Sequence, residues 1–322
     1  MHPRLATGTA ILSAIVIAIA NAVPAAAAAI PLPVTMVSAG DSITRAFDSD
    51  LTCFLTDCPH YSWSTGESVQ SHYVRLLALN PLIAGHNYNL ARTGAKMADL
   101  PMQLFIAGYY HVDYVTVLMG ANDICTSSAA AMTPYDRFFV YAWYSLYYYF
   151  QQNPGGHVFV SSIPNIYQLW STLHTNQNAL NTWAAFKICQ SMLANTNTEA
   201  DRQAVVQQEA IDNALLQYAC SLFPSCKFDN NAVFNVPFPA SEVSAIDYFH
   251  PNIAGENHLA SVTWNASFWS LGVARATALF TPAPDAATVE SVHWSRDMNM
   301  VWDRLSHATL EAGNGPPAPP HE

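Results

Sequence analysis

Three residues in this sequence have the side-chain types that nucleophilic catalysis requires. Ser42 lies in the stretch "GDSIT", and His250 ends the stretch "DYFH", three residues after Asp247. A serine hydroxyl is a weak nucleophile and needs a neighbouring base, which is normally histidine. The histidine needs an acceptor at its other ring nitrogen, and Asp247 can reach it within the same short loop. We therefore predict Ser42 as nucleophile, His250 as base and Asp247 as its orienting acid.

Attack by a serine on an acyl group creates an oxyanion, which needs hydrogen-bond donors that are already in place. The sequence offers three such donors: the backbone N–H groups of Ser42 and Gly94 and the side-chain amide of Asn122, in the turn "GAND". Gly94 suits the role because its missing side chain lets a substrate approach the backbone closely. We predict these three groups as the oxyanion donors.

Each of these residues also has an ordinary structural interpretation. Ser42 could cap the helix after its turn, Asn122 could be a turn residue, and His250 could lie on a surface loop. Taken singly, these interpretations are the commoner ones for Ser42 and Asn122, but every catalytic role is filled in this chain, which favours catalysis. Asp41 and Asp123 are predicted to bond nearby backbone amides rather than to react.

Short apolar runs alternate with amphipathic runs, and this alternation predicts the elements that position the reactive residues. Strands are expected within 33–40, 86–93, 111–123 and 157–164, and helices within 66–81, 94–108, 132–156 and 251–272. The helix within 132–156 is expected to have Thr133 as its N-cap and Pro134 as its first residue. Strands that alternate with helices predict a parallel sheet with helices on both faces.

The turns that carry the reactive residues all follow predicted strands. "AGDSIT", "ARTGAK" and "LMGAND" each begin where a strand ends. In a doubly wound sheet, ligands bind outside the carboxyl ends of the strands. The active atoms of the three turns are therefore expected along one edge of the sheet.

In this order, "GDSIT", Gly94, "GAND" and "DYFHP" resemble the SGNH (GDSL) hydrolase family, over roughly residues 34–275. The resemblance implies a three-layer α/β/α sandwich with a mostly parallel, flavodoxin-like sheet, and ester hydrolysis through an acyl-enzyme. It implies the catalytic and oxyanion roles given above, and no metal or organic cofactor. The stretch "GDSIT" lacks the second glycine of G-x-S-x-G, which argues against the α/β-hydrolase fold.

The two ends of the chain differ in composition from its centre. Residues 1–29 combine Arg4, a short apolar run and an alanine tract, which is the pattern of a secretory signal peptide. A retained anchor is the alternative, but the run is short for a membrane span, and no later segment predicts one. Residues 34–280 are predicted to form one SGNH-type hydrolase domain with a helical insertion at about 165–226, followed by a C-terminal tail, 281–322. We expect a secreted, extracellular protein.

The chain carries 12 Lys and Arg residues against 23 Asp and Glu residues, which gives a net charge of −11. An acidic protein is repelled by phosphate backbones and by anionic membranes, so nucleic-acid binding is not expected. Nothing in the sequence indicates an oligomeric state.

Six cysteines in a secreted chain predict disulfide bonds, for which fifteen pairings are formally possible. Short loops favour Cys53–Cys58 and Cys220–Cys226, which leaves Cys125–Cys189. A zinc site is the alternative, but no C-x-x-C or paired-histidine spacing supports it.

One predicted helix carries aromatic residues on all sides, in the stretch "FFVYAWYSLYYYFQQ" at 138–152. Burial on both sides is the commoner interpretation of such a helix; an acyl-binding wall or lipid-facing patch is the other, because Tyr and Trp suit such a surface. The predicted function is a secreted serine ester hydrolase that cleaves acyl or lipid carboxylic esters. A carbohydrate esterase or acyltransferase on the same site, and a secreted ligand-binding protein with a vestigial site, are the alternatives.

Overall fold

The computed structural model describes residues 30–270, so the predicted signal peptide and tail lie outside the described residues. Its centre is a five-stranded, all-parallel sheet in the order β2-β1-β3-β4-β5. The strands are β1 (Met36–Gly40), β2 (Asn87–Asn89), β3 (Tyr114–Leu118), β4 (His157–Val160) and β5 (Cys226–Phe228). The order is that of flavodoxin-like sheets, and it confirms the predicted fold class.

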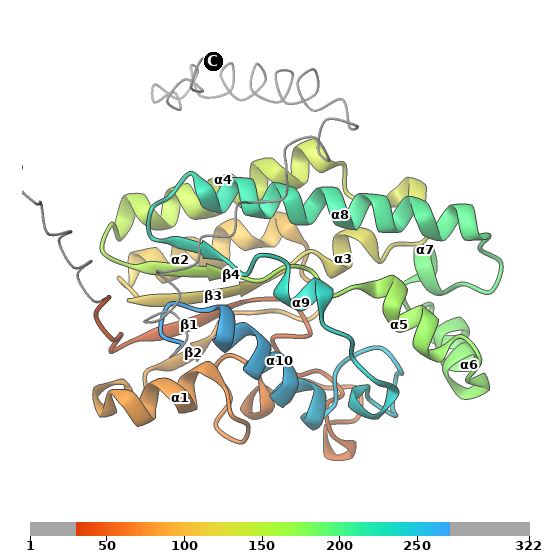
Figure 1. Cartoon of the computed structure of the whole chain (residues 1–322), viewed down its shortest axis with the longest axis horizontal. Helices are drawn as coiled ribbons and strands as arrows, with labels where there is room; N and C mark the ends of the chain where they lie inside the picture. Colours follow the sequence, from red (N-terminus) through yellow and green to blue (C-terminus); the bar gives the residue numbers. More distant parts are fainter. Residues whose placement is uncertain (1–29, 271–322) are drawn as a thin grey trace, which may run out of the picture. The chain divides into compact units, whose positions relative to one another are not determined.

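Helices cover both faces of this sheet, as Figure 1 shows. One face carries α2 (Leu100–Tyr109), α4 (Tyr135–Gln152) and α8 (Glu199–Ser221), and the other carries α1 (His72–Leu79) and α10 (Ile253–Ala266). Strands β1 and β3 are buried along their whole length, as parallel strands between two helical layers must be, whereas the edge strands β2 and β5 are only partly buried. The burial of β1 and β3 explains why they are short runs rich in Val, Leu and Ala.

Alternate residues of the strands pack into the two halves of the core, one on each face of the sheet. The side under α1 and α10 is formed by a cluster that includes Met36, Tyr114 and Phe159. The larger side, under α2, α4 and α8, is formed by a cluster that includes Val37, Val115 and Val158. This alternation follows from the two-residue period of a strand. The two-sided core fixes the register of the strands and therefore the positions of the turns that follow them relative to one another.

Most of the longer helices begin at residues with side chains that cap them. Ser71 caps α1 and Asn252 caps α10, each by accepting a backbone N–H of the first turn. Helix α4 differs from the prediction by one residue, because Pro134 is extended (φ −56°, ψ 135°) and is the N-cap itself. Thr133 therefore lies outside the helix, and Tyr135 is its first residue.

The other α-helices of the described chain are α3 (Ala121–Ile124), α5 (Ile166–Leu173), α6 (Gln177–Phe186), α7 (Gln190–Leu193) and α9 (Ala232–Asn235). The segment 165–226, predicted as a helical insertion, contains α5 to α8. Within it, α8 is the crossover helix between the parallel strands β4 and β5, and only α5 to α7 are additional to that crossover. The limits predicted for the domain itself stay a prediction.

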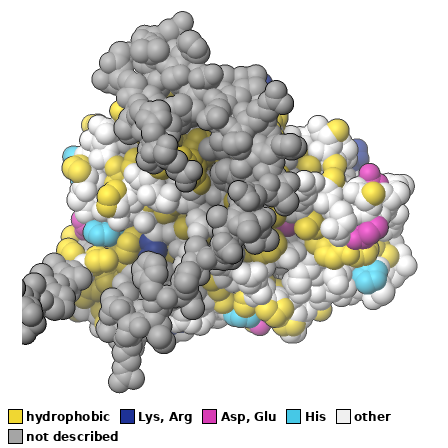
Figure 2. Space-filling model, turned by 45° about the horizontal axis from the view of Figure 1, so that its top comes forward, with side chains coloured by type: hydrophobic (Ala, Val, Ile, Leu, Met, Phe, Trp, Pro, Cys, Tyr) yellow, Lys and Arg dark blue, Asp and Glu magenta, His cyan; other side chains and the backbone are white. Residues whose placement is uncertain are grey.

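Charged side chains are sparse on the surface seen in Figure 2, where the coloured atoms outside the grey ones are mostly hydrophobic. This agrees with a chain in which charged residues make up only 11%. Among residues 30–270, no helix is both long enough and apolar enough to cross a membrane.

Candidate active site

The structure brings the predicted site residues together at the carboxyl edge of the sheet. Ser42 follows β1 by two residues, Gly94 lies in the loop after β2, and Asn122 lies on α3, directly after β3. Asp247 and His250 come from the loop that precedes α10. The turn after β1 requires glycine, because a Cβ on Gly40 (φ +155°) would lie 2.4 Å from the carbonyl oxygen of Leu118.

Ser42, His250 and Asp247 form one hydrogen-bonded row. The Nε2 of His250 lies 2.8 Å from the hydroxyl of Ser42, and its Nδ1 lies 2.5 Å from Oδ2 of Asp247. The other carboxylate oxygen of Asp247 accepts the backbone N–H groups of Phe249 (2.9 Å) and His250 (3.1 Å). All three residues are at most 9% exposed. This is the geometry of a nucleophile, a base and an orienting acid.

Buried acids surround the His250 imidazole and tune its basicity. Burial alone lowers the pKa of His250, but Asp247, and then Asp41 and Asp48, raise it above its usual value. Burial alone raises the pKa of Asp247, but the imidazole beside it lowers the pKa below its usual value. Burial raises the pKa of Asp41 to about 7 and that of Asp48, with help from the charge of Asp247, to about 6. These acids therefore stabilise the imidazolium, which is the form that His250 takes once it has accepted the proton of Ser42.

The predicted oxyanion donors converge on the same opening. Gly94 has a left-handed backbone (φ +79°), and a Cβ placed on it would meet nothing within 4 Å. Gly94, Ser42 and Asn122 line the same hollow. The amide of Asn122 donates to the carbonyl oxygen of Ala95 (3.0 Å), which leaves its second hydrogen free to face a ligand. Three donors of this kind around one nucleophile suit a tetrahedral oxyanion.

The hollow in front of Ser42 has a volume of about 430 Å³. Besides the residues already named, its walls are mainly apolar and include Phe54, Leu55, Phe186, Ile188 and Ile246. Volumes of this order suit a small organic ligand. The site therefore combines polar groups at its base with apolar walls around its mouth.

The model of the GDSL-like lipase/acylhydrolase family matches residues 36–262, which include every residue of the catalytic row. The chain belongs to this family. Carboxylic ester hydrolysis is the activity that goes with the family. A comparison with curated proteins finds no match for this GDSL-like hydrolase.

Solved structures similar to this GDSL-like hydrolase include lipases and carbohydrate esterases. An extracellular lipase from Streptomyces rimosus is 15% identical and aligns over 72% of this chain and 99% of its own, with a TM-score of 0.37. Phospholipase A1 from Streptomyces albidoflavus is 11% identical over 72% and 99% of the two chains, with a TM-score of 0.42. A family 3 carbohydrate esterase from Clostridium thermocellum is 13% identical over 76% and 98%, with a TM-score of 0.44.

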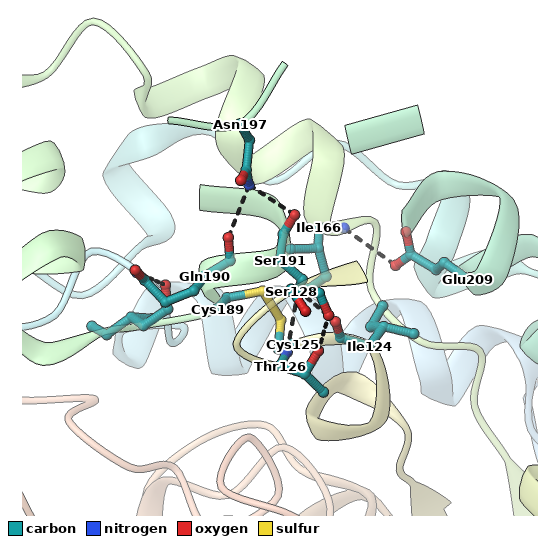
Figure 3. The surroundings of a disulfide bond; sticks show 11 residues. Ile124, Cys125, Thr126, Ser128, Ile166, Cys189, Gln190, Ser191, Asn197 and Glu209 are labelled. Carbon is teal, nitrogen blue, oxygen red and sulfur yellow. Dashed lines mark hydrogen bonds between the residues drawn. A yellow bond between two sulfur atoms is a disulfide. The ribbon is translucent and has the colours of Figure 1, made fainter. Parts of the chain in front are cut away.

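The disulfide Cys125–Cys189 closes one wall of the hydrolase's pocket, and both of its cysteines line that pocket. Figure 3 shows how hydrogen bonds reinforce it. Ser191 donates its hydroxyl to the carbonyl oxygen of Ile124 (2.6 Å) and exchanges two further bonds with the backbone of Thr126. Because Ile124 ends α3, the wall is bound to the helix that carries the predicted oxyanion residue.

The same wall is also attached to the catalytic loop. Trp183, on α6 and fully buried, donates its indole N–H to the carbonyl oxygen of Tyr248 (3.1 Å). Tyr248 lies between Asp247 and His250 and has a left-handed backbone (φ +57°). The α6–α7 segment therefore contacts both the base and the oxyanion side of the site.

The opposite wall of the pocket is a short loop that follows the nucleophile turn. Cys53–Cys58 closes this loop, and Oδ1 of Asp48 accepts the N–H of Leu55 (2.5 Å). Asp57 joins it to the Gly94 loop, since its carboxylate binds Arg45 (2.9 Å) and the Thr93 hydroxyl (2.5 Å). The third disulfide, Cys220–Cys226, joins the end of α8 to β5, away from the pocket. The structure thus contains the two pairs that short loops favoured and the remaining pair that they left, Cys125–Cys189.

The sequence did not point to the residues that shape the surroundings of the row. The rings of Phe47 and Phe249 lie 5.2 Å and 5.1 Å from the His250 ring and shield it from water. Their positions next to Asp48 and His250 in the chain were the only available signal. The aromatic run at 138–152 does not contribute, because no residue of α4 lines the pocket, and Phe138, Phe139 and Tyr149 are core residues. The interpretation of this helix as an acyl-binding wall is therefore wrong.

Two further acids behave as predicted for structural carboxylates. Asp41 accepts the N–H of Ile43 (3.0 Å), and Asp123 accepts the N–H of Met97 (2.8 Å). In the part of the chain that the structure describes, no group of three or more His, Cys, Asp or Glu residues is arranged to hold a metal ion.

Proposed function

We propose that this GDSL-like hydrolase is a secreted serine esterase that cleaves carboxylic esters of apolar acyl groups through an acyl-enzyme. The observation that carries the proposal is the 2.8 Å contact between the Ser42 hydroxyl and Nε2 of His250, at the base of a pocket with apolar walls. Asp247 completes the row from the other side of the imidazole.

In the first half of the reaction, the Ser42 hydroxyl attacks the ester carbonyl carbon while its proton moves to Nε2 of His250. The N–H groups of Ser42 and Gly94 and the amide of Asn122 hold the oxygen that becomes negative. The imidazolium then gives its proton to the leaving alcohol as the carbon–oxygen bond breaks. The acyl group stays on Ser42 as an ester, and the alcohol leaves.

In the second half, water takes the place of the alcohol. His250 removes a proton from the water, whose oxygen attacks the acyl carbon, and the same donors hold the oxyanion. The imidazolium returns the proton to the Ser42 oxygen, and the carboxylic acid is released. The raised pKa of His250 fits both roles, because the group must accept and donate a proton in each cycle.

The pocket walls favour an acyl or lipid ester over an acetylated sugar. Phe54, Leu55 and Phe186 present carbon only, and none of the described residues that line the pocket is Trp or Tyr, the amphipathic rings that suit a polar, ring-shaped ligand. A carbohydrate esterase or an acyltransferase on the same row is the alternative, because neither the leaving alcohol nor the acceptor is selected by the catalytic groups themselves.

Secretion is part of the proposal and is supported by the disulfides. All six cysteines are paired, and disulfides form and persist in oxidising compartments. The predicted signal peptide at 1–29 lies outside the described residues.

The test is a rate profile on p-nitrophenyl esters from acetyl to palmitoyl, run with wild type and Ser42→Ala. We expect rates that rise beyond acetyl and are abolished by the substitution. Ser49→Ala is the matched control, because this nearby serine is buried and its hydroxyl has no hydrogen-bond partner among the described residues. A serine-directed organophosphonate should label Ser42 alone.

Two results would contradict the proposal in different ways. Turnover confined to acetyl esters would move the substrate to small or carbohydrate esters. Binding of long-chain esters with no serine-dependent turnover would instead indicate a ligand-binding protein with a vestigial site.

A further inference from the structure

Four large apolar side chains stand exposed around the mouth of the pocket. We call them the collar: Leu51, Phe54, Leu55 and Phe186, which are 78%, 63%, 49% and 61% exposed. Three of them line the pocket itself, and Leu51 lines an adjoining hollow that shares Asp48 and Ile246 with it. The collar therefore continues the apolar walls of the site outward. Exposed apolar groups gathered around a binding site mark a surface that meets a partner.

Two residues at the collar have backbone conformations that are unfavourable in free energy. Leu55 (φ +53°) and Lys187 (φ +54°), which follows Phe186, both adopt the left-handed conformation that residues with a Cβ disfavour. Such conformations persist where the surroundings enforce them, and they cluster at functional sites. Leu55 is held by the Asp48 carboxylate, which binds its N–H, within the loop that Cys53–Cys58 closes. Lys187 is the C-cap of α6, and its N–H binds the carbonyl oxygen of Trp183.

We propose that the collar docks this hydrolase onto the surface of an uncharged or zwitterionic lipid, from which an acyl ester enters the pocket directly. This rests on the proposed function. Phe54, Leu55 and Phe186 line the same pocket as Ser42, so docking and substrate entry would share one opening. Apolar side chains that enter the boundary of a lipid layer gain free energy in proportion to the area removed from water.

The charge of the chain decides which lipid surface fits. The net charge is −11, so an anionic surface repels the protein. At the mouth, Asp57 pairs with Arg45, Asp50 beside Leu51 carries a negative charge, and the charge within 184–190 on the Phe186 side is a single lysine, Lys187. A basic cluster of the size that recruits proteins to anionic lipids is therefore absent from the described collar segments 50–58 and 184–190.

Other exposed apolar residues lie elsewhere and serve as controls. Leu82 is 72% exposed and lies shortly before β2. The carbonyl oxygen of the neighbouring His86 accepts the N–H of Met36, the first residue of β1. Leu82 therefore lies at the amino ends of the strands, opposite the site. Tyr110, 71% exposed at the end of α2, lines a separate apolar hollow.

The experiment measures adsorption to large vesicles of phosphatidylcholine by co-sedimentation, with the full chain carrying Ser42→Ala so that no lipid is consumed. We expect saturable binding, and a partition coefficient that falls about tenfold in Leu51→Ser, because one leucine side chain is no longer buried in lipid. Leu82→Ser and Tyr110→Ser should bind as the parent does. With Ser42 intact, Leu51→Ser should hydrolyse dissolved p-nitrophenyl butyrate at the wild-type rate, because Leu51 does not line the catalytic pocket.

Several outcomes would overturn the proposal. These are no adsorption, an equal loss in Leu82→Ser, a loss in Tyr110→Ser instead of Leu51→Ser, or tighter binding to vesicles that contain phosphatidylglycerol. Self-association that Leu51→Ser abolishes would make the collar a contact between two copies of this chain. Adsorption without butyrate hydrolysis would overturn only the proposed function, and hydrolysis without adsorption would overturn only the collar.

Discussion

The inner and outer halves of the site are built by opposite means. The inner row of Ser42, His250 and Asp247 is almost fully buried and is positioned by hydrogen bonds. The outer collar side chains, such as Phe54 and Phe186, are mostly exposed and have no polar group that could hold them. Their positions depend on the backbone, which is constrained by two disulfides and contains residues in the left-handed conformation.

This difference separates two requirements of catalysis on an ester. Proton transfer needs atoms at hydrogen-bonding distance, which directional bonds between buried groups supply. Acyl binding and docking need apolar area with little directional precision, which a braced loop can supply. Substitutions in the inner half should therefore change kcat, and substitutions in the outer half should change KM or adsorption. The predictions below test this division, from the largest expected change in rate to the smallest.

Asp247→Asn should lower kcat by about 10⁴-fold, because an amide cannot hold the imidazole in the tautomer that accepts the serine proton. The loop should keep its shape, since the Oδ1 acceptor of two backbone N–H groups is retained. Glu242→Gln is the matched control, because it changes another acid–histidine pair, with His258 (2.6 Å), outside the row. Steady-state kinetics on a short ester measure both, and a loss under tenfold in Asp247→Asn would contradict the assignment.

Asn122→Ala should lower kcat by about 10²- to 10³-fold with little change in KM, because the lost amide, besides its bond to Ala95, acts on the substrate only as the oxyanion forms. Asn153→Ala removes a similar bond, from its amide to the carbonyl oxygen of Val112 (2.8 Å), far from the site. The control should lower the melting temperature comparably but leave kcat unchanged. If both variants kept the wild-type kcat, Asn122 would have no part in the reaction.

Removing the Cys125–Cys189 disulfide, by alanine at both positions, should affect stability and substrate binding more than chemistry. The cysteines are 64 residues apart, so the crosslink contributes about 4 kcal/mol to the free energy of unfolding by the chain-entropy account. KM for octanoyl esters should rise, since the wall with Phe186 and Ile188 loosens.

The control for this pair is alanine at Cys220 and Cys226, which are 6 residues apart and away from the pocket. Their loss should cost about 2 kcal/mol and leave KM unchanged. Urea denaturation gives the stabilities. Equal effects of the two disulfides on KM would show that the wall does not depend on its local crosslink.

Asp48→Asn should shift the acid limb of the kcat/KM profile to lower pH. The Asp48 carboxylate is one of three acids that raise the pKa of His250, and it carries its charge above its own pKa of about 6. Without this charge the imidazole loses its proton at lower pH, and the neutral base is available there. Asp50→Asn, at an exposed acid that does not act on His250, should leave the profile in place; an unchanged profile in both variants would remove Asp48 from the electrostatics of the site.

The sequence predicted the fold class and the residues that meet at the sheet edge because both depend on local patterns. Ser42, Gly94 and Asn122 each follow a strand, and parallel strands deliver such turns to one edge. The collar could not be predicted, because Phe54 and Phe186 come from segments far apart in the chain and neither belongs to a periodic pattern. The aromatic helix α4 left two interpretations open for a related reason: its sequence does not tell which neighbours cover it. In the structure α2 and α8 pack against α4, and four of its rings are buried.

The unequal spans of the three disulfides have a consequence for how the chain reaches its native state. Cys53 with Cys58, and Cys220 with Cys226, meet by closing loops of a few residues, which a chain does rapidly. Cys125 and Cys189 lie before and after β4 in the chain and meet where the α5–α7 segment packs against α3, so theirs is the disulfide of largest sequence separation. Trapping free thiols during oxidative refolding would therefore find this pair oxidised last, and its closure would report that the catalytic pocket has been assembled.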